Sequence, residues 1–455
     1  MENTNFDVIV IGAGFAGLAA AIEARNAGAS VLIVEKMKAP GGNSIISDGG
    51  IAIPGSDLQK KANVKDSPEL MYKDMMAAGL HLNHPTLVET VCKNALDAYV
   101  WTKEYLQVQY LDRVDLFGGH SVARSHAVAG VSGAGLIKPM LNKAAELDIE
   151  IRKGIAFKHF IRRDGKIAGI KVVDYFSENN TEVTALYAGK AVVFACGGFG
   201  ADVAFRSVQD PRLTKDIDTT NKHSAKAEAL TEALKLGAMP IQLSHIQLGP
   251  WASPDEKGFG NGPLFADYIG FIYGMIVHHK TGKRIVHEQA DRKTVSDAIL
   301  AAGKPCLCIC DSKAVENSGW DLSKAIKKEV VRIFSTLKEL ADYHGLPLHA
   351  LNKSIKEAEQ LENRTAPASL RQKPFYCMRV WPKVHYTMGG IQIDSQARVI
   401  DLDNRPIEGL YAAGEATGGV HGASRLGSCA ITDCLVFGRI AGQNAAANTQ
   451  ISETE

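Results

Sequence analysis

The sequence has almost no net charge and no segment in which charge of one sign accumulates. Its formal net charge is +1 over 455 residues, and acidic and basic residues are interspersed. Binding to nucleic acid or to an anionic membrane through electrostatics requires a strongly basic surface. The composition therefore gives no reason to expect nucleic acid or a charged membrane as a partner.

Long hydrophobic runs are missing as well. No apolar run reaches the roughly 18 residues that a membrane-spanning helix needs. The first residues lead directly into a strand-like stretch, without the basic and apolar segments of a secretory signal. We therefore expect a soluble protein that is located in the cytoplasm.

The sequence also lacks the residue clusters that hold haem, iron–sulfur clusters or metal ions. It contains no C-x-x-C-H motif, no ferredoxin-like run of cysteines, and no histidine–carboxylate group with ligand-like spacing. Three cysteines alternate within the apolar run 306–310, which predicts one face of a buried strand. His278, His279 and His287 are interpreted as surface residues of strands or loops. We expect no metal site.

Glycine, by contrast, is abundant, with 43 in the chain. A β-branched strand is predicted near the N-terminus and a helix at residues 18–27. Between them lies a G-x-G-x-x-G motif formed by Gly12, Gly14 and Gly17, with Ala16 inside it. The first glycine permits the turn, the second lets a pyrophosphate approach the backbone, and the third lets helix and strand pack closely. The N–H groups at the helix N-terminus would then face the phosphates.

Glu35 supports the interpretation of this motif as a dinucleotide site. It follows a second predicted strand, residues 31–34, at about the spacing of twenty residues that is typical of such sites. A carboxylate at this place accepts hydrogen bonds from an adenosine ribose. The alternative is an exposed acid at the end of a strand.

A second glycine-rich stretch favours FAD over NAD. Its residues are Gly41, Gly42, Asn43, Ser44, Gly49 and Gly50. Glycines let a backbone run close beside the rest of an extended FAD molecule. Far downstream, the apolar run 192–196 predicts another strand, which ends in Gly197 and Gly198. We therefore predict an FAD site that is closed by distant pieces of the chain.

Several motifs in combination are typical of one protein family. Besides the N-terminal fingerprint, they are residues 41–44, 118–126, 195–198, 282–284, 385–390 (H-Y-T-M-G-G) and 409–442, which contains G-A-S-R-L-G. With these motifs the chain resembles the flavoprotein family of fumarate reductase and succinate dehydrogenase, especially its soluble, single-chain fumarate reductase branch. The resemblance covers nearly the whole length.

The resemblance implies an α/β fold with a Rossmann-like FAD-binding domain made of two chain segments and an inserted α+β capping domain. We expect the two segments at residues 1–239 and 384–455, and the cap at residues 240–383. Polar helical stretches predicted at residues 324–343 and 351–363 would suit a mobile lid.

The resemblance also assigns residues to the cofactor. Gly414 and Glu415, together with Ala430 and Ile431, match the segments that bind the ribityl chain and ring of the flavin. The other cofactor residues implied by the family are Lys36, Ala156, Ala195, Asn221 and Arg425.

Four residues match the family's substrate chemistry. His385 and Arg425 correspond to the pair that binds one substrate carboxylate. His245 resembles a cap histidine that contacts the other end of the substrate, and Arg292 matches the arginine that donates a proton. The alternatives are structural: a core histidine for His245 or His385, an anchor among turn glycines for Arg425, and a solvated surface charge for Arg292.

The chain departs from the family at two informative places. Asn43 stands where membrane-bound members carry the histidine that attaches FAD covalently, so we expect non-covalent FAD. Soluble fumarate reductases carry a Thr–Glu pair and a further arginine in the cap, whereas this chain has Asp267, Tyr268 and Phe271 there. An acid at that place would repel a second carboxylate, and the aromatic residues would suit a bulkier enoate. A local misalignment is the alternative.

These observations predict an FAD-dependent oxidoreductase that reduces the C=C bond of an α,β-unsaturated carboxylate, fumarate or a related enoate. One alternative keeps the fold and reverses the direction, as in L-aspartate oxidase or the ketosteroid dehydrogenases. Another is a flavin-binding protein without turnover. The sequence contains no cytochrome segment, so we expect the electrons to come from reduced flavin or a partner reductase.

Overall fold

The computed structural model describes residues 4–177, 183–361, 368 and 370–448, and its centre is an eight-stranded sheet. Six strands follow one another in the order β17-β18-β8-β1-β2-β5, and β6 and β7 extend the sheet beside β8. Their bounds are β1 Asn5–Ile11, β2 Val31–Glu35, β5 Glu150–Lys153, β6 Ile155–Arg163, β7 Lys166–Asp174, β8 Thr184–Phe194, β17 Arg398–Ile400 and β18 Pro406–Ala412.

The middle of this sheet is parallel. β1 pairs in parallel with both β2 and β8, so that Val10 lies between Ile33 and Val193. These strands are rich in valine and isoleucine and are buried, as expected for parallel strands that are covered on both faces. The predicted α/β class and the parallel strands around residues 8–11, 31–34 and 192–194 are confirmed.

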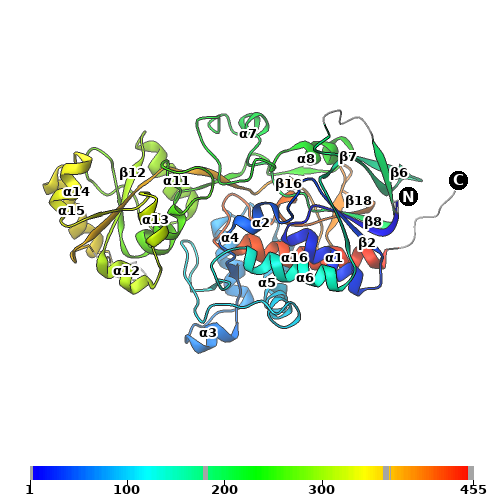
Figure 1. Cartoon of the computed structure of the whole chain (residues 1–455), viewed down its shortest axis with the longest axis horizontal. Helices are drawn as coiled ribbons and strands as arrows, with labels where there is room; N and C mark the ends of the chain where they lie inside the picture. The colour runs from blue at the N-terminus through cyan, green and yellow to red at the C-terminus, as the bar shows by residue number, and fades with distance from the viewer. Residues whose placement is uncertain (1–3, 178–182, 362–367, 369, 449–455) are drawn as a thin grey trace.

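Helices from both ends of the chain cover the sheet together (Figure 1). α1 (Phe15–Asn26) packs against α16 (Cys429–Ala447), and α6 (Ala134–Glu146) lies beside α1. Helices α1 and α16 approach so closely at Gly442 that a Cβ added there would lie 2.1 Å from the carbonyl oxygen of Ala20. Other helices of this part are α2 Gly42–Ile46, α3 Asp57–Lys61, α4 Pro68–Ala78, α5 Pro85–Val100, α7 Val203–Gln209 and α8 Glu228–Lys235.

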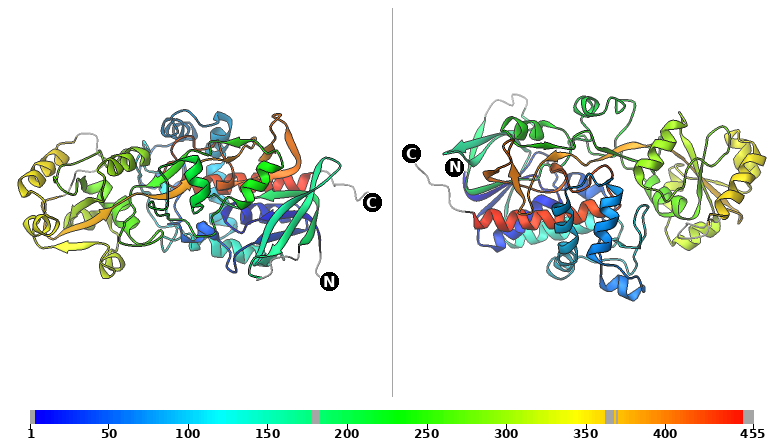
Figure 2. Two further views of the ribbon diagram at one scale, coloured as in Figure 1. Left: turned by 90° about the horizontal axis from the view of Figure 1, so that it is seen from above. Right: turned by 180° about the vertical axis from the view of Figure 1, so that it is seen from behind.

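A second, antiparallel sheet lies at one end of the molecule in all views, away from both chain termini (Figures 1 and 2). Its order is β11-β12-β14-β13. The strands are β11 Met275–Val277, β12 Cys306–Asp311, β13 Arg332–Phe334 and β14 Phe375–Val380, and the helices around them are α11 Arg292–Ala301, α12 Ser312–Ser318, α13 Ser323–Lys327, α14 Leu337–His344 and α15 Leu348–Glu359. The predicted cysteine strand is confirmed: the three cysteines of β12 belong to one apolar cluster, whereas Leu307 and Ile309 belong to the cluster on the other face.

Three helix predictions need correction. Residues 324–343 are not one helical stretch, because α13 ends at Lys327 and α14 begins only at Leu337. Between them β13 pairs with β14, with Ile333 opposite Tyr376, and its β-branched Ile333 and aromatic Phe334 favour a strand. The helix predicted at residues 351–363 begins earlier, at Leu348, and the last residues of that prediction lie outside the described residues. α1 also begins earlier than residue 18, at Phe15, directly after the glycine motif.

The chain passes between the two sheets along paired strands. β10 (Ile246–Gly249), on the way out, pairs antiparallel with β15 (Lys383–Thr387), on the way back. Close by, β9 (Pro240–Ile241) pairs with β16 (Gly390–Ile391). The predicted division at residues 239/240 and 383/384 falls at these pairs, and it stays a prediction. Among the described residues, no helix combines the length and apolar character needed to cross a membrane.

Candidate active site

A cavity of about 630 Å³ lies at the carboxyl ends of the parallel strands and extends to the part that carries the second sheet. Ligands of open α/β sheets bind at this edge. The cavity is lined by most of the residues predicted from the sequence. These are Gly12, Gly14, Ala16, Glu35, Lys36, Gly41, Gly42, Asn43, Ser44, Gly50, Ala156, Ala195, Gly197, Gly198, Asn221, Asp267, Tyr268, Arg292, His385, Glu415, Arg425, Ala430 and Ile431.

Four predicted residues are not part of this lining: Gly17, Gly49, His245 and Gly414. Gly17 packs beneath the loop, since an added Cβ would lie 1.9 Å from the carbonyl oxygen of Gly12. His245 lies just before β10, where its backbone bonds to Gln242 and Met388. Burial and Lys293 lower the pKa of its side chain. The proposed contact of His245 with substrate stays a prediction.

The glycine loop is held in the shape that the motif predicts. Gly12 has a φ of +102°, and a Cβ there would lie 2.5 Å from the carbonyl oxygen of Ala195, so only glycine fits. The carboxylate of Glu35 accepts hydrogen bonds from Ala13 N at 3.0 Å and Met37 N at 2.8 Å. Glu35 is therefore a buried anchor of the loop as well as a part of the cavity wall, not an exposed acid.

The residues at this end of the cavity fit the adenosine and pyrophosphate of FAD. α1 begins after Gly14 without a side-chain cap, so backbone N–H groups of its first turn remain open to an anion. Phe15 N is the exception, because it donates to Ser44 Oγ at 3.1 Å. With Glu35 placed for a ribose and a glycine-lined passage leading onward, the site suits an extended dinucleotide.

Asn43 makes close contacts on both sides of its amide. Its Nδ2 donates to Asn221 Oδ1 at 2.5 Å, and its Oδ1 accepts from Lys222 N at 2.8 Å. Asn221 in turn donates to the carbonyl oxygens of Val384 and His385. These bonds tie the glycine-rich stretch to the start of β15, where the cavity passes from its glycine-lined part to its charged part.

The far part of the cavity is cationic. Arg425 is 5% exposed, and its Nη1 donates to Leu426 O at 2.9 Å. Burial and the positive charge of Arg292 lower the pKa of Arg425 to about 10. The ring of His385 forms a hydrogen bond through Nδ1 with Thr220 Oγ1, at 2.9 Å. Burial, with Arg425 and Arg292 nearby, holds the pKa of His385 well below its ordinary value, so this histidine is neutral.

Two of these groups retain unused donor atoms. Nε of Arg425 and Nη1 of Arg292 are buried and have no hydrogen-bond partner among the described residues. A buried guanidinium nitrogen left unpaired is costly, and arginine matches the two oxygens of a carboxylate. The lining of this part therefore suits a small carboxylate ligand.

One wall of the same part is acidic and aromatic. Asp267 Oδ2 lies 3.2 Å from Arg292 Nη2, and Tyr268 OH donates to Asp48 Oδ2 at 2.9 Å. Burial raises the pKa of Asp267 to about 6, although Arg292 opposes the shift, and Asp48 raises it further. The prediction that residues 267 and 268 belong to the same pocket as the arginines agrees with this lining.

Sequence reasoning missed several residues of this wall. Trp251, Phe259 and Trp320 line the cavity, and the ring of Trp251 meets His385 edge to face at 4.7 Å between centroids. Asp48 was also missed. Its place between Gly42 and Gly49 was the available signal, because that stretch was already expected to run beside the flavin.

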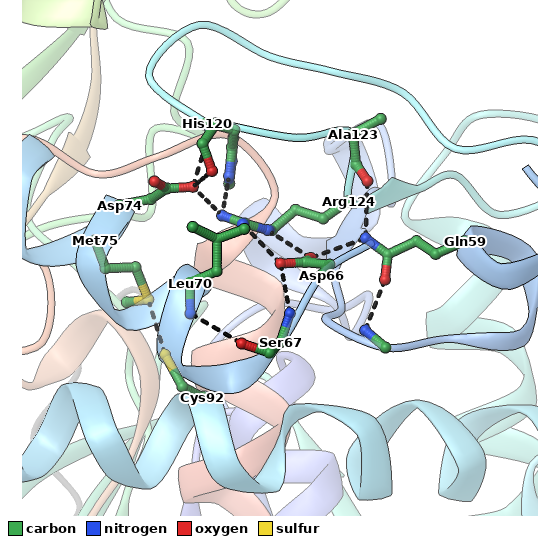
Figure 3. Close-up of polar contacts among 12 residues, drawn as sticks. Gln59, Asp66, Ser67, Leu70, Asp74, Met75, Cys92, His120, Ala123 and Arg124 are labelled. Carbon is green, nitrogen blue, oxygen red and sulfur yellow. Dashed lines mark hydrogen bonds and ion pairs between the residues drawn. The ribbon is translucent and has the colours of Figure 1, made fainter. Parts of the chain in front are cut away.

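Arg124 is the centre of a buried ion cluster with Asp66 and Asp74 (Figure 3). Arg124 is fully buried and donates to both oxygens of Asp66 at 2.9 Å and to Asp74 Oδ2 at 2.6 Å. It also contacts His120, whose Nε2 lies 2.9 Å from the carbonyl oxygen of Gly427. Gly427 is two residues after Arg425, so the cluster supports the backbone that carries this arginine.

Comparisons with known proteins agree with this geometry. Residues 7–431 match the protein family described as FAD binding domain. The sequence is 40% identical to the acrylate reductase flavoprotein subunit of Shewanella woodyi, over 96% of this chain and 90% of that protein. It is 32% identical to the urocanate reductase of Eggerthella lenta, over 98% of this chain and 75% of that protein. The open conformation of a flavocytochrome c3 fumarate reductase superposes with a TM-score of 0.77 at 30% identity, covering 98% of this chain and 78% of that one.

Proposed function

The chain belongs to the family of FAD-binding flavoproteins that contains fumarate, urocanate and acrylate reductases, and on this premise we propose that it reduces the C=C bond of an α,β-unsaturated carboxylate. One observation carries the proposal. Arg425, Arg292 and the neutral His385 line one end of a cavity whose other end fits the nucleotide of FAD. The same cavity can therefore hold a carboxylate against a flavin.

The residues divide the work. Arg425 and His385 bind the carboxylate and polarise the double bond toward attack at its β-carbon. FAD, when bound and reduced, supplies the hydride. Arg292 donates a proton to the other carbon through its unpaired Nη1. Arginine is a weak acid, but hydride addition to the β-carbon leaves a carbanion-like α-carbon, which is a far stronger base, so the proton transfer to that carbon is favourable.

The acidic wall favours a substrate with a single carboxylate. Asp267 and Asp48 line the same cavity as the two arginines, and like charges in a buried pocket repel, so a second carboxylate beside these acids is disfavoured. Trp251 and Phe259 offer apolar surface instead. Acrylate or an enoate with an uncharged β-substituent fits this wall better than a dicarboxylate.

We further propose that FAD is bound without a covalent link and that residues 240–383 close over the substrate. An asparagine amide is no nucleophile, and the amide of Asn43 is already engaged on both sides. The paired strands β10 and β15 lie close to the two boundaries of this division and would form its hinge. Reduced free flavin or a partner reductase would supply the electrons.

Anaerobic photoreduction of the purified flavoprotein tests the function directly. Acrylate, cinnamate, urocanate and fumarate are added separately, and the return of oxidised-flavin absorbance is followed. We expect reoxidation by an enoate, faster for monocarboxylates than for fumarate, and loss of turnover in Arg292→Ala with FAD still bound. If no enoate reoxidises the flavin, the proposal is wrong.

Arg425 and His385 could equally bind the carboxylate of an amino acid, as an amino-acid oxidase requires. In that case the oxidised protein would be reduced by L-aspartate, and O2 would reoxidise it rapidly. To distinguish the oxidase from the reductase, L-aspartate is added anaerobically to the oxidised protein and the bleaching of the flavin is followed.

A further inference from the structure

The two terminal nitrogens of Arg292 differ in their surroundings. Its Nη2 contacts Asp267 at 3.2 Å, whereas its Nη1 is buried without a partner among the described residues. Both side chains are 12% exposed, so bulk water has little direct access to either. A guanidinium that gives a proton to substrate from one nitrogen must regain it before the next turnover. Asp267 is the acidic group in contact with its other nitrogen.

Asp267 also borders a second, small cavity. This cavity has a volume of about 10 Å³, close to the smallest volume that holds one water molecule. Asp267, Arg292 and Glu288 all line this cavity. The carboxylate of Glu288 is completely buried, but it is paired with Arg284 at 2.7 Å, and Arg284 is 14% exposed. Two acidic groups, Asp267 and Glu288, therefore line the same small cavity, and Glu288 is paired with an arginine that is partly exposed to solvent.

We propose that Asp267 is the acid that returns a proton to Arg292 after each turnover, and that the small cavity beside Glu288 connects it with solvent. The inference rests on the proposed role of Arg292 as proton donor. It also gives a reason for the departure from the family pattern, since the positions of the family's glutamate and further arginine hold Tyr268 and Phe271 here.

The proton balance is simple. The substrate carbon forms a C–H bond with the proton of an Arg292 N–H bond, which leaves a neutral guanidine. The O–H bond of protonated Asp267 then breaks, its proton forms a new N–H bond on Arg292, and a solvent proton restores the acid. This transfer is strongly downhill because a neutral guanidine is a far stronger base than a carboxylate. Burial raises the pKa of Asp267 to about 6, which keeps part of it protonated near neutral pH.

The test compares the first turnover with the later ones, with acrylate as substrate. Arg292 starts protonated, so photoreduced Asp267→Asn holoenzyme should complete its first flavin reoxidation at a rate within about threefold of wild type. Steady-state kcat with a chemical reductant should fall about 100-fold, the range for loss of one acid–base group. Asp297→Asn is the matched control: this acid also pairs with a cation of α11, Lys293, but lies at the surface and should change neither rate.

A second variant leaves the charges unchanged. Val295 lines the small cavity and is buried, and Val295→Ile would fill it. We expect a fast first turnover and a slow steady state here too. Wild-type kcat in Asp267→Asn overturns the inference. A first turnover slowed as much as the steady state also overturns it, because Asp267 would then only position Arg292. Failure of the proposed function itself would be recognised separately, since wild-type reduced flavin would then not react with any enoate.

Discussion

Nη1 of Arg124 lies 3.0 Å from Nδ1 of His120, and this contact determines which nitrogen of the histidine carries the proton. Arginine can only donate, so Nδ1 accepts. The hydrogen must then be on Nε2, which donates to the carbonyl oxygen of Gly427 at 2.9 Å. Burial and Arg124 lower the pKa of His120 to about 4, so the ring stays neutral. A buried cation thus fixes the loop that follows Arg425.

This relationship predicts different effects for two substitutions of His120. A glutamine can still donate to Gly427 O, whereas an asparagine retains an acceptor near Arg124 but cannot reach Gly427. We expect His120→Asn to raise KM for the enoate about tenfold, the value of one lost hydrogen bond, and His120→Gln to raise it less. Flavin content should stay constant in both. Equal KM values for the two variants would refute a role for the Gly427 bond.

Removing the buried cation should cost stability. Arg124→Met leaves Asp66 and Asp74 without their partner, and breaking a buried ion pair from one side costs about 3–5 kcal/mol. Urea unfolding at neutral pH measures the change. Lys338→Met is the control, because Lys338 and Asp342 form an exposed pair, and such pairs contribute little. A loss below about 1 kcal/mol for Arg124→Met would contradict the expected cost.

Acid should weaken the fold through buried histidines. Burial lowers the pKa of His126 to about 4, and its Nδ1 donates to Arg124 O while Nε2 accepts from Ser56. Between pH 4 and the ordinary histidine value of about 6.5, the unfolded chain therefore binds more protons than the folded one. The contribution of neutral His126 to the free energy of unfolding is therefore complete above pH 6.5 and is lost as the pH falls toward 4.

A substitution of His126 separates its pH effect on stability from the effects of other groups that stabilise the folded protein at low pH. Burial raises the pKa of Glu415 to about 7, so this acid favours the folded state at low pH. In His126→Asn the slope of the unfolding free energy against pH, between pH 4.5 and 6.5, should fall by up to about 1.4 kcal/mol per pH unit, the value for one proton. An unchanged slope would mean that His126 is not neutral in the folded protein.

Gly17 offers a test of the nucleotide loop. An added Cβ would lie 1.9 Å from the carbonyl oxygen of Gly12, and this oxygen belongs to backbone that cannot move without shifting the loop. We expect Gly17→Ala to be purified with little or no flavin, as judged by the ratio of absorbance at 450 nm (about the usual flavin maximum) to that of protein. Gly28→Ala is the control, because nothing lies near a Cβ there, although its φ of +88° brings some strain. Full flavin content in Gly17→Ala would contradict the packing argument.

The glycine loop was predictable because its requirement is local. Gly12, Gly17 and Glu35 lie within one βαβ unit, and each is needed by backbone geometry that short spacing specifies. The cysteine strand was predictable for the same reason, from strict alternation. The stretch 324–343 was predicted wrongly because polar residues of helical spacing surround β13, and only pairing with the distant β14 makes those residues a strand.

The acidic wall of the pocket could not be predicted as a unit. Asp48 and Tyr268 share a hydrogen bond although 220 positions separate them, and no pattern in either segment specifies the other. The resemblance placed Asp267 near the substrate, but its contact with Arg292 depends on how η2 (Ala266–Gly270) and the N-terminus of α11 meet in space. Such contacts arise from the packing of distant elements, and a single sequence contains no pattern that specifies this packing.

Arg425 is expected to be sensitive even to lysine. Its guanidinium is buried over the ring of Tyr386, 4.8 Å from the centroid, with Nη1 on Leu426 O and Nε unpaired among the described residues. Lysine keeps the charge but cannot present two parallel N–H groups to a carboxylate. We expect Arg425→Lys to lower kcat/KM for acrylate at least about 100-fold, corresponding to the roughly 2–5 kcal/mol of a broken buried charge contact.

The measurement is steady-state reduction of acrylate, together with flavin content. Arg398→Lys is the matched control, since Arg398 also pairs with a carboxylate, Asp394, but is 42% exposed. If Arg425 held only the turn around it, Arg425→Lys would change stability while kcat/KM stayed near wild type. A loss of activity with flavin retained and the fold intact would instead place the substrate carboxylate at Arg425, because lysine preserves the net charge and removes only the two-pronged contact.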